Sequence, residues 1–137
     1  MANYIAKIRS NYFAVTDEAK LREIIASCIS EEKVEVFMRS GTYGFGCYGS
    51  IYGLPANEDE NYTGNELNLF YEALQSILAE DDIIIITEIG HEKLRYFIAQ
   101  CTIISKTDIQ FVNLRDIAMI KARKMLKNSN FTTQMDY

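Results

Sequence analysis

The segment from Gly44 to Gly49 (GFGCYG) matches the G-x-G-x-x-G pattern of loops that bind phosphate groups. In a dinucleotide-binding fold such a loop joins a strand to a helix, whose N-terminus faces the pyrophosphate. The residues that follow, from Ile51 to Pro55, are not typical of a helix. Because a lone motif of this kind is a weak signal, a glycine-rich aromatic hairpin is the favoured interpretation of the segment, with its glycines at bulges or turns.

His91 is the single histidine of the chain, and the segment HEKLR that it begins resembles the zinc motif H-E-x-x-H. Arg95 stands at the second ligand position, whereas a zinc site needs three or four convergent His, Cys or carboxylate ligands. The motif therefore fails, and we expect no metal. His91 could act as a general base beside Glu88 or Glu92, but a residue that follows a turn at Gly90 needs no such role.

These patterns do not assemble a complete catalytic set. The sequence therefore favours a protein that is not an enzyme, that uses no cofactor and that has no catalytic residue. The alternative is a small enzyme or nucleotide-binding domain, with a ligand site built from Gly44, Gly46, Gly49, His91 and Arg95.

The three cysteines are odd in number and widely spaced, which fits reduced thiols in the cytoplasm better than a disulfide framework. Cys28 follows the apolar stripe of an expected helix, and Cys101 lies among apolar residues of an expected strand, so we expect both in the core. Cys47, in the glycine-rich segment, is the best candidate for a reactive thiol. The sequence shows no His or Asn partner for it.

Charge is distributed very unevenly along the chain. The net charge is −5, yet residues 40–92 contain ten acids and no Lys or Arg, and residues 93–137 carry a net charge of +5. An acidic surface of this origin would dock on the basic surface of another protein, including a cleft that normally holds nucleic acid. Alternatively, basic residues from the flanking segments pair with it. The residues expected on the surface are Glu58, Asp59, Glu60, Asp81, Asp82 and Glu88.

Other classes of partner are less favoured. The last expected helix has a basic face, but the overall acidity argues against direct binding of nucleic acid. The longest strongly apolar run, Ile83 to Ile86, is far too short for a membrane span. A homo-oligomer stays open, with the aromatic hairpin from Tyr43 to Tyr52 as the expected contact. We therefore expect a cytoplasmic protein whose partner is a host protein with a basic surface.

Hydrophobic periodicity predicts one α+β domain over residues 1–127, followed by a loose tail over residues 128–137. The domain is a mostly antiparallel sheet with two or three helices packed mainly on one face. Expected helices begin at Asp17, at a Thr63–Glu66 capping box and at Asn113, and the second ends before Glu80. Expected strands cover residues 2–15, 34–38, 83–86, 94–104 and 109–112, and the run 83–86 is typical of a strand buried on both faces.

Two strings, RSNYFAVTDE at residues 9–18 and GHEKLRY at residues 90–96, resemble a family of small uncharacterised proteins of bacterial phages and conjugative elements. The glycine-rich stretch at residues 46–50 belongs to the same resemblance, which covers most of the chain. It implies no catalytic or binding residue. It implies a context: an accessory protein of a mobile element, of a kind that often acts on host defence by binding and sometimes imitates nucleic acid.

Overall fold

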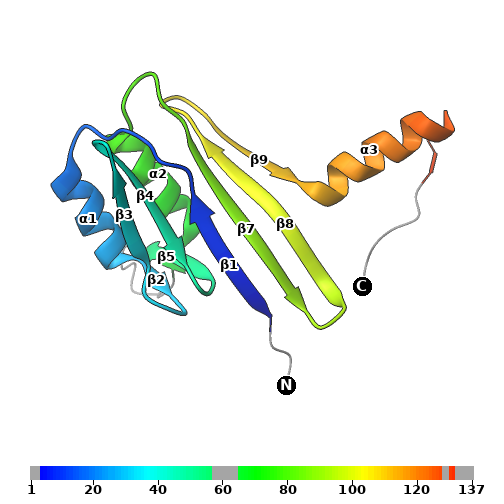
Figure 1. Cartoon of the computed structure of the whole chain (residues 1–137), viewed down its shortest axis with the longest axis horizontal. Helices are drawn as coiled ribbons and strands as arrows, with labels where there is room; N and C mark the ends of the chain where they lie inside the picture. Colours follow the sequence, from blue (N-terminus) through cyan, green and yellow to red (C-terminus); the bar gives the residue numbers. More distant parts are fainter. Residues whose placement is uncertain (1–3, 57–64, 128–129, 132–137) are drawn as a thin grey trace.

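The structure, a computed structural model, describes residues 4–56, 65–127 and 130–131. Its strands are β1 (Ile5–Ser10), β2 (Ile29–Ser30), β3 (Glu35–Arg39), β4 (Thr42–Cys47), β5 (Ile51–Pro55), β6 (Asn65–Glu66), β7 (Ile84–Glu92), β8 (Arg95–Ile104) and β9 (Ile109–Asn113). Its helices are α1 (Glu18–Ser27), α2 (Leu67–Ile77) and α3 (Leu114–Leu126). The predicted α+β class is confirmed (Figure 1).

The main sheet has six strands in the order β3-β4-β1-β7-β8-β9, and every neighbouring pair is antiparallel. The first strand of the chain, β1, lies near the centre of this sheet. It pairs with β4 on one side, where Ile8 faces Cys47, and with β7 along its whole length on the other, from Ile5 opposite His91 to Ser10 opposite Ile86. The short strands β2, β5 and β6 form a second, three-stranded sheet.

Helices α1 and α2 cover one face of the main sheet (Figure 1). Each supplies the apolar stripe that its sequence period predicts: α1 buries Leu21, Ile24 and Ile25, and α2 buries Phe70, Leu74 and Ile77. Helix α1 starts where expected, because the Asp17 side chain accepts a hydrogen bond from the Lys20 amide at 3.0 Å.

The two ends of α2 differ in how they are stabilised. Helix α2 begins at Leu67 with Glu66 as its N-cap, and Glu66 makes no side-chain cap; Thr63 of the expected capping box lies outside the described residues. The helix ends at Ile77, before Glu80 as predicted. Its last turn contains no basic residue, but Lys106 donates hydrogen bonds to the carbonyl oxygens of Ser76 (3.1 Å) and Leu78 (2.9 Å). This cation from the β8–β9 turn offsets the negative end of the helix dipole.

The sheet face opposite α1 and α2, here called the open face, has no described helix over it (Figure 1). Residues of β7 alternate between the two faces, so Ile84 and Ile86 are buried whereas Ile85 is 39% exposed. The prediction that residues 83–86 are buried on both faces was therefore wrong.

The turn expected at Gly90 was also misplaced. Gly90 is buried inside β7, and the chain reverses at Lys93 and Leu94 instead. A Cβ atom at Gly90 would collide with the ring of Tyr4, whose hydroxyl donates to Glu88 Oε2 at 2.8 Å. The glycine thus makes room for a ring rather than for a turn.

Helix α3 departs from the body of the domain. Its start is the predicted one, since the Asn113 side chain accepts from the Asp116 amide at 2.8 Å. The helix then projects away from the sheet (Figure 1), and none of its residues is buried. The described part of the chain contains no helix that is both long enough and apolar enough to cross a bilayer.

Gly53 and Gly41 provide a matched test of the β5–β6 contact. Both have positive φ, +111° and +79°, but a Cβ at Gly53 would strike the backbone of Glu66, whereas a Cβ at Gly41 meets nothing within 4 Å. We expect Gly41→Ala to lower the free energy of unfolding by about 1 kcal/mol, through backbone strain alone. Gly53→Ala should cost roughly 3 kcal/mol or more, because β6 must also move. Equal unfolding midpoints in urea for the two variants would contradict this.

Candidate functional site

The glycine-rich segment forms a strand and a turn, not a phosphate-binding loop. Gly44 and Gly46 lie within β4, and β5 rather than a helix follows. A Cβ at Gly44 would lie 3.0 Å from the carbonyl oxygen of Asn11, and one at Gly46 would lie 3.2 Å from that of Ile8. These two glycines therefore permit close contact between β4 and the chain of β1, and no helix N-terminus faces them as a pyrophosphate site requires.

His91 and Arg95 lie near the tip of the β7–β8 hairpin and not beside those glycines. His91 is exposed, and its Nδ1 lies 3.2 Å from the carbonyl oxygen of Lys93. Arg95 donates to Glu92 Oε1 at 2.8 Å, and the buried Glu92 carboxylate raises the pKa of the Arg95 guanidinium. Strands β4 and β7 lie on opposite sides of β1, and the groove that His91 lines contains no residue of β4. The structure does not bring the two halves of the alternative ligand site together.

The cysteines show no arrangement for nucleophilic or metal chemistry. Cys47 is only 5% exposed, and its thiol donates to the carbonyl oxygen of Glu32 at 3.3 Å. Burial raises the pKa of the partly buried Cys28 to about 11. Over the described ranges, no group of three or more His, Cys, Asp or Glu side chains could hold a metal ion.

The predicted acidic residues fall into different places. Glu58, Asp59 and Glu60 lie outside the described residues. Asp81 is exposed in the turn between α2 and β7. Asp82 is partly buried, and its carboxylate accepts from the amides of Ala14 (2.6 Å) and Ile83 (2.8 Å).

Glu88 is separate from these residues. It lies six residues farther along, roughly 20 Å away for an extended strand, on the helix-covered face of β7. There it accepts the Tyr4 hydroxyl. Burial and this hydrogen bond raise the pKa of Tyr4. The structure thus brings Asp81 and Asp82 together but not Glu88.

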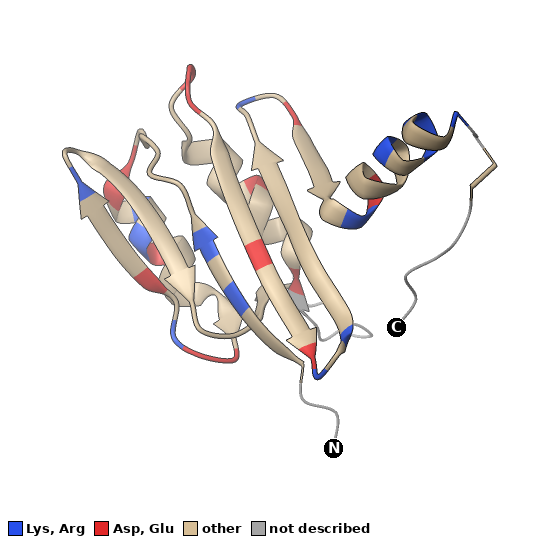
Figure 2. Ribbon diagram, turned by 45° about the vertical axis from the view of Figure 1, so that its right-hand side comes forward, with Lys and Arg blue, Asp and Glu red and all other residues tan. Residues whose placement is uncertain are grey.

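Most of the described acids of the middle segment form no ion pair with the flanking basic residues. Within the described ranges the ion pairs are Lys20–Glu23, Arg22–Glu18 and Arg95–Glu92, so Glu92 is the single acid of residues 65–92 in an ion pair. Glu72 lies on the exposed side of α2, Glu66 precedes the helix, and Glu80 and Asp81 follow it (Figure 2). We call these four residues the acidic face.

Three members of the acidic face were missed in the sequence. Glu66, Glu72 and Glu80 were treated as parts of a helix or its ends, and not as members of a surface. The signal was present, because Glu72 stands opposite the apolar stripe of the predicted helix and therefore had to be exposed. About 17 Å of helix separates the two ends of α2, so the acidic face follows its full length.

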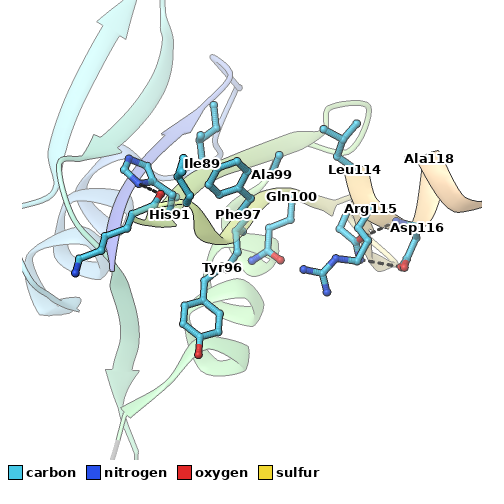
Figure 3. A pocket seen from close by; sticks show the side chains of 15 residues that line it. Ile89, His91, Tyr96, Phe97, Ala99, Gln100, Leu114, Arg115, Asp116 and Ala118 are labelled. Carbon is cyan, nitrogen blue, oxygen red and sulfur yellow. Dashed lines mark hydrogen bonds between the residues drawn. The ribbon is translucent and has the colours of Figure 1, made fainter. Parts of the chain in front are cut away.

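A groove of about 940 Å³ lies between the β7–β8 hairpin and α3 (Figure 3). Strand β9 pairs with β8 only from Gln100 to Ile104, so the edge of β8 from Arg95 to Ala99 has no described strand beside it. The hairpin wall includes Ile89, His91, Tyr96 and Phe97, and the α3 wall includes Leu114 and Ala118. The sequence did not predict this groove, because periodicity predicts neither where α3 points nor where β9 stops.

Comparisons of the chain with protein-family models, with curated proteins and with solved structures find no significant match. The resemblance of residues 9–18 and 90–96 to proteins of mobile elements therefore stays a prediction. The function has to be inferred from the acidic face and the groove themselves.

The two neighbouring acids Asp81 and Asp82 should behave differently on substitution. Asp82→Ala should lower the free energy of unfolding by roughly 1–2 kcal/mol, because two backbone amides lose a charged acceptor. Asp81→Ala should change it by less than about 0.5 kcal/mol, as is usual for an exposed side chain. Urea unfolding of both variants measures the difference, and an unchanged Asp82→Ala midpoint would show that these hydrogen bonds do not matter.

The thiols of Cys28 and Cys47 should be unreactive in the folded protein. At about pH 8, a thiol with a pKa near 11 is roughly one part in a thousand thiolate, and Cys47 is buried. We expect iodoacetamide to label either residue at least tenfold more slowly in the native protein than in urea, where thiol pKa values return to about 8.5. Peptide mapping after timed labelling checks this, and fast native labelling of Cys47 would revive it as a reactive thiol.

Proposed function

We propose that this chain is a non-enzymatic binding protein that docks on the basic surface of another protein through the acidic face. The observation that carries the proposal is the lack of ion pairs: Glu66, Glu72, Glu80 and Asp81 have no Lys or Arg within ion-pair distance in the described part of the chain. Their field therefore extends into solvent. Such a field speeds encounter with a positively charged partner and selects against negatively charged ones.

The position of the acidic face also suits docking. Helix α2 is held rigidly by Phe70, Leu74 and Ile77 in the core, so the carboxylates that border it are presented from a fixed element. Glu72, the member of the acidic face that lies on the helix itself, therefore loses less freedom on binding than a side chain on a loose loop would.

The resemblance to proteins of mobile elements supports a more specific form of the proposal. A basic cleft that normally holds nucleic acid is a surface to which such a face is complementary. We infer that the partner is a nucleic-acid-handling or defence protein of a bacterial host, and that binding inhibits it.

Charge reversal on the acidic face tests the function. Purified wild type and the variant Glu72→Lys/Asp81→Lys are used to capture proteins from a bacterial host lysate at low salt. The matched control, Glu32→Lys/Glu35→Lys, has the same change in net charge at exposed positions at and just before β3, where neither side chain forms an ion pair. We expect the acidic-face variant to lose at least about tenfold of the captured basic protein, and the control to retain it.

Salt and competition complete the test. Capture by wild type should disappear in about 0.5 M salt, where charges are screened within a few ångströms. Duplex DNA should compete for the captured protein if its basic surface is a nucleic-acid site. Equal capture by both variants would exclude the acidic face as the binding surface.

A further inference from the structure

Helix α3 lacks the tertiary packing that a helix of its length needs to be stable in water. It has 13 residues and buries none of them, although helices of this length are marginal in water without tertiary packing. Its large apolar side chains are largely exposed: Leu114 is 61% exposed, Ile120 52%, Met125 85% and Leu126 61%. The helix therefore needs an apolar surface that the rest of the described chain does not supply.

The adjacent edge of β8 lacks a strand to pair with. Its backbone from Arg95 to Ala99 faces the groove without a strand partner. Phe97 is 54% exposed, and Tyr96, which is 51% exposed, has a positive φ of +54° at the register shift between β7 and β8. Free edges of this kind are usually protected, because they pair readily with another strand. Here the protection is confined to the start of the strand, where Arg95 and the irregularity at Tyr96 lie, and the described edge from Phe97 to Ala99 has neither a proline nor a covering helix.

The apolar side chains exposed around the groove and along α3 offer about as much area as one side of a stable protein–protein interface. Counting α3, the hairpin tip and β8, nine large apolar side chains are at least 39% exposed. At on the order of 100 Å² each they offer roughly 900 Å² per copy, and a stable complex buries about 800 Å² on each partner. These residues are Ile89, Leu94, Tyr96, Phe97, Leu114, Ile117, Ile120, Met125 and Leu126.

We propose that a second copy of this chain occupies the groove. The β8 edges of two copies pair antiparallel about a two-fold axis, and α3 of each copy packs across the β7–β8 hairpin of the other. Antiparallel pairing of two identical edges is two-fold symmetric by construction, so each copy gives and receives the same contacts. A second copy thus meets both needs at once: it supplies a strand for the β8 edge and an apolar surface for α3.

The chemistry of the groove favours this occupant over an acidic or nucleic-acid partner. Its walls are apolar over most of their area, although Lys93, Arg115 and Asp116 also line them. Every buried side-chain nitrogen or oxygen of the described residues already has a hydrogen-bond partner, so none is left for a polar ligand. The basic residues of α3 that lie beyond the groove, such as Lys121 and Lys124, are exposed. The proposed contact is therefore apolar and should persist at high salt, unlike the docking of the acidic face.

Sedimentation equilibrium of the full chain at about 50 µM, where a stable dimer forms by mass action, tests the proposal. We expect wild type at twice the monomer mass, in low and in high salt, and Ile117→Glu/Ile120→Glu as a monomer. Both substituted positions are exposed in the single chain, so the variant should keep the folded sheet, lose at most the helical circular dichroism of α3, and have an unfolding midpoint that no longer depends on protein concentration. The control is Tyr48→Glu, which places the same charge on a 71% exposed side chain of the β4–β5 hairpin.

The masses of the two variants show whether the dimer contact lies at α3 or at the β4–β5 hairpin. Monomeric wild type, or a dimer that Tyr48→Glu dissociates and Ile117→Glu/Ile120→Glu does not, would overturn the proposal.

Single cysteines placed at Tyr96, Phe97 and Ile98 test the pairing of edges: at least one should form a disulfide between copies, whereas a cysteine at Met38 on the opposite sheet edge should not. A dimer with none of these cross-links would overturn the β8 pairing. Glu72→Lys/Asp81→Lys should remain dimeric, so failure of the acidic-face function and failure of the dimer are distinguishable.

Discussion

One set of aromatic contacts fixes the position of helix α2 on the main sheet. The Phe45 ring packs edge-on against Phe13 at 6.3 Å and against Phe70 of α2 at 5.7 Å, and all three rings are 0–1% exposed. Because Phe45 belongs to β4 and Phe13 follows β1, these contacts join two adjacent strands to one helix. The position of α2 follows from them, and so does the position of the acidic face.

The same contacts explain the glycines around Phe45. With Phe45 directed into the core, Gly44 and Gly46 lie on the other face of β4, where the β1 chain approaches to about van der Waals distance. A sequence pattern that resembled a phosphate loop is therefore the pattern of a strand with one large inward residue between two positions where a Cβ atom would crowd the neighbouring chain. The contact between β1 and β4 depends on all three.

Much of the fold was predictable because local signals agreed with the final packing. Asp17 and Asn113 cap helices as their residue types predict, and the apolar periods of α1 and α2 match their buried faces. The errors arose where tertiary structure decides. Whether residues 83–86 are covered on one face or on both depends on where the helices pack. Helix α3 projects away from the sheet, so the second face stays uncovered by any described helix. The acidic surface was only partly predictable, because sequence shows which segments lack Lys and Arg but not that Asp82 would be engaged by backbone amides.

The central position of β1 has a consequence for how the chain folds. Residues 5–10 find their longest partner in residues 86–91, so the middle of the sheet forms from segments about 80 residues apart. Contacts of such long sequence separation make folding slow, because the loop between them must close before they contribute. On a ribosome, β1 would emerge long before β7, and the edge of β1 that later pairs with β7 would stay unpaired in the meantime. During that interval the nascent chain is open to wrong strand pairing, and a chain cut short before Ile84 would lack the strand that completes its centre.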